Sequence, residues 1–184
     1  MVIRSLLLAA SDDFGYGVQH LLKAGAKWNV YTREEHNSAL FEALVHRNFV
    51  AAEKLIEAGA DVNEFGIDTY EVGDESTVEE KKTKETVLQA AVRHAKDSDP
   101  ESAHELFDLL LKTVRSIDDL NENGQTALMI AVSQDNGWIA RRLCDAGANP
   151  DIQDYDGQSA SSIALYKTSG DIPVLFPEDS PPMK

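Results

Sequence analysis

One phrase of nine residues constrains this chain more than any other feature, because it recurs along the sequence. Residues 55–63 carry Leu-Ile-Glu-Ala-Gly-Ala-Asp-Val-Asn, with close copies at residues 21–29 and 143–151 and a diverged copy at residues 110–118. A unit this short cannot bury its own apolar face. The repetition therefore predicts an array in which each unit packs against its neighbours.

A second phrase keeps a fixed distance from the first. It occupies residues 38–43, and related phrases begin at Arg4, Thr86 and Thr126. In three units the leucines of the two phrases lie 15 residues apart, as Leu40 and Leu55 do. Two apolar segments at this spacing predict a pair of short antiparallel helices in each unit.

The two phrases resemble the ankyrin repeat, whose unit of about 33 residues has a Thr-Pro-Leu-His-x-Ala start and a Gly-Ala-Asp-x-Asn end. The resemblance covers residues 4–168. It implies an all-α solenoid of helix-turn-helix units joined by β-turn or hairpin fingers, with about four repeats and a C-terminal half-repeat cap. The expected repeats are 1–33, 34–66, 82–121, 122–154 and a partial unit at 155–170, all within a domain at 1–170 that a tail at 171–184 follows.

Hydroxyl residues stand just before each first helix, where a side-chain oxygen can accept from unpaired backbone N–H groups. These expected N-caps are Ser38, Thr86, Thr126 and Ser159. Glycines follow the second helices, where the chain must turn left-handed, and the expected C-caps are Gly25, Gly59 and Gly147. The histidine of the family phrase is replaced throughout, so its hydrogen-bond bracing is expected to be missing. The replacing residues are Leu7, Phe41, Gln89, Met129 and Ser162.

Extra chain interrupts the register between the second and third units, mainly as an insert at residues 66–85. Its first half alternates apolar and polar residues, whereas Thr77 to Glu85 is charged and suits a helix. Long inserts are more often functional or disordered than idle. One hypothesis is an extended finger that touches a partner, and the alternative is a solvated loop. The contact residues under the first hypothesis are Ile67, Tyr70 and Val72, flanked by Glu71, Asp74 and Glu75.

Finger positions supply the other candidate contacts. Three equivalent positions hold apolar residues where solvated ones are usual, namely Tyr31, Phe65 and Leu120. Tyr155 and Glu122 share the next position, and Asp119, Asp154 and Asp156 surround them. An aromatic anchor ringed by charge has the composition of an interface hot spot. The alternative is that these side chains pack between adjacent fingers.

The formal charge of -15 selects among partners. Such a field repels nucleic acid and anionic lipid, and it accelerates encounter with a basic protein. The alternative is that acidity only keeps the chain dissolved. A single cysteine, Cys144, favours a reducing, cytoplasmic setting. Leu6 to Ala10 imitate an export segment, but Asp12 and Asp13 end that run early.

Motifs of catalysis are missing from the sequence, as are phosphate-binding loops, Cys-x-x-Cys pairs and His-Glu-x-x-His. The sequence therefore predicts a non-enzymatic protein-binding module with no cofactor, metal, nucleic acid or membrane partner, monomeric outside its complex. A sharper hypothesis, based on size and charge, is an immunity-type or antitoxin-type neutraliser of a cationic toxin. The alternatives are an adaptor, effector or regulatory role, and last a hydrolytic or metal-dependent enzyme.

Overall fold

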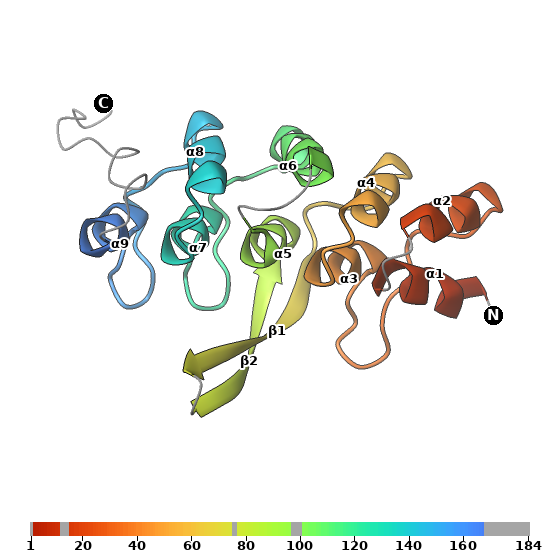
Figure 1. The fold of residues 1–184 in the computed structure, drawn as a ribbon, viewed down its shortest axis with the longest axis horizontal. Coiled ribbons are helices and arrows are strands. Elements are labelled where there is room, and N and C mark those ends of the chain that lie inside the picture. The colour runs from red at the N-terminus through yellow and green to blue at the C-terminus, as the bar shows by residue number, and fades with distance from the viewer. Residues whose placement is uncertain (1, 12–14, 75–76, 97–100, 168–184) are drawn as a thin grey trace. The chain divides into compact units, whose positions relative to one another are not determined.

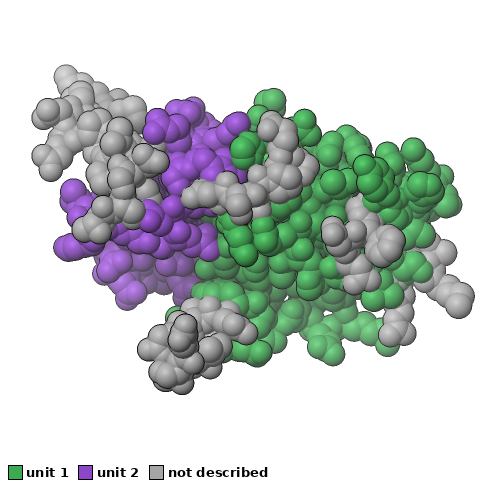
Figure 2. All heavy atoms as spheres, in the orientation of Figure 1, with its two compact units in different colours: residues 1–115 green, residues 116–184 purple. Residues whose placement is uncertain are grey.

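A computed structural model of the chain describes residues 2–11, 15–74, 77–96 and 101–167 (Figure 1). The chain divides into two compact units, residues 1–115 and residues 116–184 (Figure 2). Each unit is built from short helices, as the repeated phrases predict. The expected tail at 171–184 lies outside the described residues.

The first unit contains three successive helix pairs. The first helices of the pairs stack side by side, α1 against α3 and α3 against α5, and the second helices stack in a parallel row, α2 against α4 and α4 against α6 (Figure 1). Each helix thereby covers the apolar stripe of the helix before it. The six helices are α1 Val2–Ser11, α2 Gly15–Lys23, α3 Ala39–Val45, α4 Phe49–Glu57, α5 Val87–His94 and α6 Glu101–Thr113.

The second unit repeats the arrangement on a smaller scale. Helix α7, Ala127–Ser133, packs against both α8, Gly137–Asp145, and α9, Ala160–Tyr166. The single helix α9 lies in the interval expected for the half-repeat, and no second helix follows it up to residue 167, where the described part of the chain ends.

Leucine and phenylalanine side chains fill the space between helices, as expected. Leu55, Leu106, Phe107 and Leu110 are all buried. Cys144 of α8 is only half-buried. It lies on the flank of α8, beside rather than inside the line of Ile139 and Leu143.

The four expected N-caps are confirmed. Ser38 accepts a hydrogen bond from the backbone N–H of Phe41, and Thr86, Thr126 and Ser159 each accept from the N–H three residues on. The expected loss of bracing is wrong at two units. Gln89 and Ser162 close capping boxes, in which their side chains accept from the backbone N–H of Thr86 and Ser159. The three expected C-cap glycines, residues 25, 59 and 147, all have a positive φ.

A β-hairpin is the element that the all-α expectation omits. Strand β1, Phe65–Asp74, pairs antiparallel with β2, Thr77–Thr86, so the charged segment 77–85 is a strand and not a helix. Its local preference yields to the ladder of hydrogen bonds with β1. The root pair Phe65–Thr86 corresponds to the isolated bridges Tyr31–Ser38 and Gln153–Ser159. The hairpin is thus a lengthened finger, which projects from the helices of the first unit in Figure 1.

Gly66 allows the root of the hairpin to approach α3. A Cβ added there would lie 2.5 Å from the ring of Phe41, which is fully buried. Phe41, which replaces the family's histidine in this unit, therefore packs directly against the first residues of β1.

We expect Gly66→Ala to destabilise the chain by about 1–3 kcal/mol, because a buried ring cannot move aside without repacking. Urea unfolding of the single variants and of Gly66→Ala with Phe41→Leu measures the coupling. Relief of part of the loss in the double variant is expected. A fully additive result would show that the contact with Phe41 is not the cause.

Candidate partner-binding surface

Asn37 ties the hairpin to the finger before it. Its Oδ1 accepts from the backbone N–H of Ile67 at 2.7 Å, and its Nδ2 donates to the Ile67 carbonyl oxygen at 2.8 Å. The same Nδ2 lies 2.9 Å from a carboxylate oxygen of Glu42. Asn37 is itself buried, so these bonds are shielded from water. One amide therefore fixes where β1 leaves the helices.

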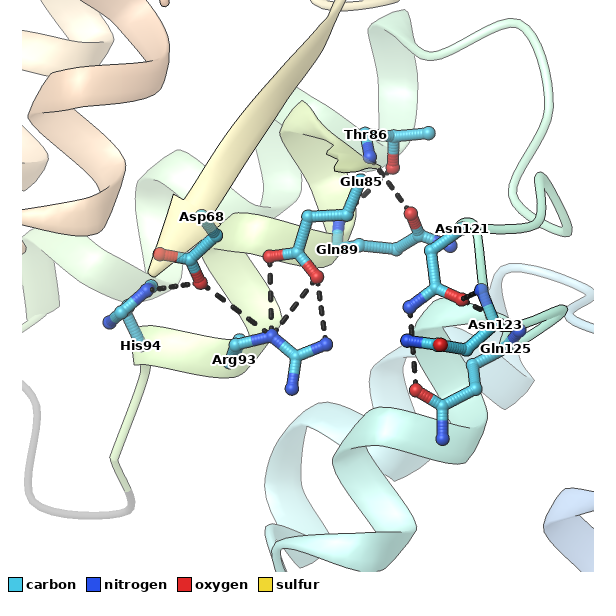
Figure 3. Close-up of polar contacts among 9 residues, drawn as sticks. All are labelled: Asp68, Glu85, Thr86, Gln89, Arg93, His94, Asn121, Asn123 and Gln125. Atoms are coloured by element: carbon cyan, nitrogen blue, oxygen red, sulfur yellow. Dashed lines mark hydrogen bonds and ion pairs between the residues drawn. The ribbon is translucent and has the colours of Figure 1, made fainter. Parts of the chain in front are cut away.

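A buried cluster of charged side chains lies beneath the hairpin (Figure 3). Arg93 of α5 donates to Glu85 of β2 through Nε at 3.0 Å and Nη2 at 2.8 Å. Its Nε also lies 3.6 Å from Asp68 Oδ2 of β1, which is 2.8 Å from His94 Nε2. Asp68 and Glu85 are both fully buried. We call Asp68, Glu85, Arg93 and His94 the root cluster.

The remaining face of Arg93 meets an aromatic ring. The guanidinium carbon lies 4.2 Å from the centroid of Tyr70, within cation–π range. Tyr70 is half-buried, so much of the ring that was predicted to meet a partner instead covers the root cluster. A buried ion pair is costly to break once formed, because the surviving charge has no water to solvate it.

The root cluster brings two buried carboxylates, Asp68 and Glu85, close to the guanidinium of Arg93. Burial raises the pKa of Glu85 to about 7, against the opposing effect of its hydrogen bonds with Arg93. Oxygen Oδ1 of Asp68 is buried without a hydrogen-bond partner. The cluster therefore takes up a proton near neutral pH, which relieves the repulsion between its two carboxylates.

The pH dependence of stability should show this proton. Between the ordinary pKa of 4.5 and the folded value of about 7 for Glu85, the folded state holds the proton more firmly than the unfolded state. The stabilisation is complete below pH 4.5 and is lost as the pH rises through 7. Between pH 4.5 and pH 7, the free energy of unfolding, measured by urea titration, should therefore decrease less in Glu85→Gln than in the parent chain. The exposed neighbour variant Glu80→Gln should behave as the parent does; equal slopes in all three chains would refute the assignment.

Arg93 should not tolerate lysine. We expect Arg93→Lys to cost about 1–3 kcal/mol, because an ammonium group can neither bridge Glu85 through two nitrogens nor stack flat on Tyr70. Chemical unfolding of Arg93→Lys beside the exposed control Arg141→Lys measures the difference. A loss no larger than that of the control would mean that the root cluster does not hold the hairpin.

In the first unit, two of the predicted finger residues are exposed. Tyr31 is 39% exposed and stacks on His36 at 4.8 Å between ring centroids. Phe65 is 46% exposed, with the ammonium of Lys84 at 5.6 Å from its ring centroid. Ile67 is half-buried beside them. Glu71, Val72 and Asp74 lie in β1, but their side chains are outside those described, and Glu75 lies outside the described residues.

In the second unit, the predicted residues gather on two turns. Leu120 is 40% exposed, and Asp119, Glu122 and Asp156 are also exposed. Tyr155 is 74% exposed although one side of its ring covers Gly124, where an added Cβ would lie 2.8 Å from Cδ1. Packing between adjacent fingers, the alternative raised from the sequence, therefore occurs on one side of the Tyr155 ring only.

Asp154 has a different place from the one predicted. It is half-buried, and its Oδ1 accepts from the backbone N–H groups of Asp156 at 3.0 Å and Gln158 at 2.8 Å. Asn121 Oδ1 does the same one unit earlier, as Figure 3 shows for Asn123 and Gln125. The carboxylate of Asp154 therefore stabilises its own turn, whereas Asp119, Glu122 and Asp156 carry the exposed charge.

The root cluster and the basic character of β2 were not predicted from the sequence. Lys81, Lys82 and Lys84 are all exposed on that strand, and Lys82 Nζ lies 2.7 Å from Glu35. A helical interpretation of the segment hid the alternation that puts Thr83 and Glu85 on the buried face. The register places Asp68 opposite Thr83 and Gly66 opposite Glu85, so the two carboxylates are diagonal neighbours on one face of the hairpin.

The described residues contain no group of three or more histidine, cysteine, aspartate or glutamate side chains that could hold a metal ion. Among the helices of the described part, none is long and apolar enough to cross a membrane. The arrangement offers exposed rings, charges and backbone edges, which are the means of binding another macromolecule.

Comparison with known proteins agrees with this arrangement. A family model for ankyrin repeats, in three copies, matches residues 72–154. A protein of Acanthamoeba polyphaga mimivirus that is named as an ankyrin repeat protein is 29% identical over 143 residues, which is 76% of each chain. With stacked helix pairs, capped turns and these matches, the chain contains ankyrin repeats over residues 72–154. Ankyrin repeats generally mediate protein–protein interaction, and the family is typically not enzymatic.

Proposed function

We propose that this chain holds a basic protein partner through its fingers and the concave face beside them. The observation that carries the proposal is the exposure of four large apolar side chains at finger positions, Tyr31, Phe65, Leu120 and Tyr155. Large rings at exposed tips gain free energy only when a partner covers them. A monomer outside its complex and a cytoplasmic setting belong to the same proposal.

Charge supports the basic character of the partner. The chain carries a formal charge of -15, and Asp119, Glu122 and Asp156 are exposed on the turns of the second unit, which also carry Tyr155. Complementary charge around an aromatic anchor speeds encounter and sets orientation. A neutraliser of a cationic toxin is one form of this function, and it rests on size and charge alone; adaptor, effector and regulatory roles use the same surface.

Tyr155→Ala tests the anchor. Affinity capture from the native source at low and high salt supplies the partner, and calorimetry with the purified partner measures the affinity. We expect a loss of about 2 kcal/mol in binding, because the ring supplies contact area, with little change in the free energy of unfolding. The exposed ring of Tyr16 on α2 provides the control variant Tyr16→Ala. Equal affinity of the parent and the Tyr155 variant would remove the anchor from the interface.

Glu122→Lys with Asp156→Lys tests the charge. This pair leaves the turn-forming Asp154 intact, so a loss of binding is not a loss of the finger. The association rate should fall at low salt and approach that of the parent at high salt. The double variant Glu105→Lys with Asp145→Lys makes the same change in net charge on helices α6 and α8 and serves as the control. Equal rates for the two double variants would show that the tips are not the contact.

A further inference from the structure

The hairpin keeps an open edge on β2. The register alternates between residues that bond across the hairpin and residues that point outward, and three contacts fix the alternation. The N–H of Ile67 donates to the Asn37 side chain and its C=O accepts from it, while the N–H of Thr86 donates to the Gln89 side chain. The backbone groups of Ile67 and Thr86 therefore point away from the opposite strand. Val87 donates to Glu64 across the root, so this pair points inward.

Counting along β2 from Thr86 places the backbone groups of Glu80, Lys82 and Lys84 on the outer edge, since outward residues recur every second position. Lys81 and Thr83 then bond to Tyr70 and Asp68 across the ladder. Within the described residues, no turn, loop or helix end makes a backbone hydrogen bond to Glu80, Lys82 or Lys84. An edge of this kind can take another strand.

Between residues 80 and 84, the exposed side chains of β2 are mainly basic. Three exposed lysines, Lys81, Lys82 and Lys84, stand against one exposed glutamate, Glu80. Lys82 already meets Glu35, but an ammonium group has three donors and can serve a second acceptor. No other stretch of this acidic chain brings three lysines so close together. Lysines on an edge repel a strand of the same composition and attract one of opposite charge.

We propose that β2 accepts an extended acidic segment of a partner protein as a third strand of the hairpin sheet. Backbone bonds at Glu80, Lys82 and Lys84 supply the attachment. Acidic side chains two residues apart on the added strand lie opposite Lys82 and Lys84, about 5.5 Å away between Cβ atoms. This surface and this chemistry are separate from the finger tips and their basic partner.

Charge selects this occupant over a second copy of the chain. The β2 edge of a copy carries the same excess of lysine, and the charge of -15 on each chain opposes approach. An acidic segment on a partner of moderate overall charge meets less long-range repulsion than a second copy does, and its carboxylates gain close pairing with the lysines.

Amide hydrogen exchange measured by NMR tests the edge directly. The probe is a synthetic peptide of about ten residues that alternates glutamate with threonine, a length typical of a strand. The peptide should slow exchange at the outward amides of Glu80, Lys82 and Lys84 by about tenfold or more. The amides of Lys81 and Thr83 are protected by the ladder beforehand and should change little. Binding without selective protection of the outward amides would overturn the proposal, as would protection that grows with protein concentration in the absence of peptide.

Two variants separate strand addition from simple attraction of charge. Lys82→Glu with Lys84→Glu should weaken peptide binding about tenfold or more, whereas Lys27→Glu with Lys112→Glu makes the same charge change elsewhere and should not. Glu80→Pro removes an outward donor, which an edge strand tolerates, and also removes a negative charge. Weaker binding by Glu80→Pro supports backbone pairing, and stronger binding overturns it.

Retained protection at Lys81 and Thr83 verifies that the hairpin of each variant is folded. Tyr155→Ala should bind the peptide as the parent does, so failure of the finger-tip function and failure of the edge are distinguishable. A loss of peptide binding in Tyr155→Ala would contradict the placement on β2.

Discussion

A single guanidinium between two buried carboxylates is the interaction on which the distinctive part of this molecule depends. Arg93 belongs to α5, Glu85 to β2 and Asp68 to β1, so one side chain joins both strands to the helix that follows them. Two strands alone are marginal in water. The hairpin persists because its root is bonded to a packed helix and to Asn37, and because Tyr70 closes the cluster from one side.

The repeated part of the fold was predictable because its physics is local. A hydroxyl before an apolar stripe, a glycine after the next stripe and a spacing of 15 residues between leucines specify two helices and their ends. Thr126 and Gly147 therefore occupy the places that the sequence predicted. The positions of exposed finger residues such as Tyr31 and Leu120 followed from the same register.

The hairpin and its root cluster were harder to predict, for two physical reasons. The preference of residues 77–85 for a helix is weak, and a ladder with a distant strand outweighs it. The contacts of Arg93 join residues 8 and 25 positions away, and no spacing within the sequence announces them. Tyr70 was placed among the partner contacts because the sequence could not show that its ring already had a neighbour. Asp154 was placed among the same contacts, and the bonds of its carboxylate to its own turn could not be read from the sequence either.

The shared root pairing of the fingers has a consequence for how such a chain can change. Tyr31–Ser38, Phe65–Thr86 and Gln153–Ser159 close their fingers in the same way, although the middle one encloses far more chain. Thr86 is both the last residue of β2 and the N-cap of α5, so the closing pair sets where the chain enters the helix. Residues can therefore be added to or removed from a finger in opposed pairs, one residue on each strand. Side chains two residues apart along a strand point to the same face, so the alternation continues along the longer hairpin. A finger of this kind can therefore change in length while the packing of the helices beneath it stays the same.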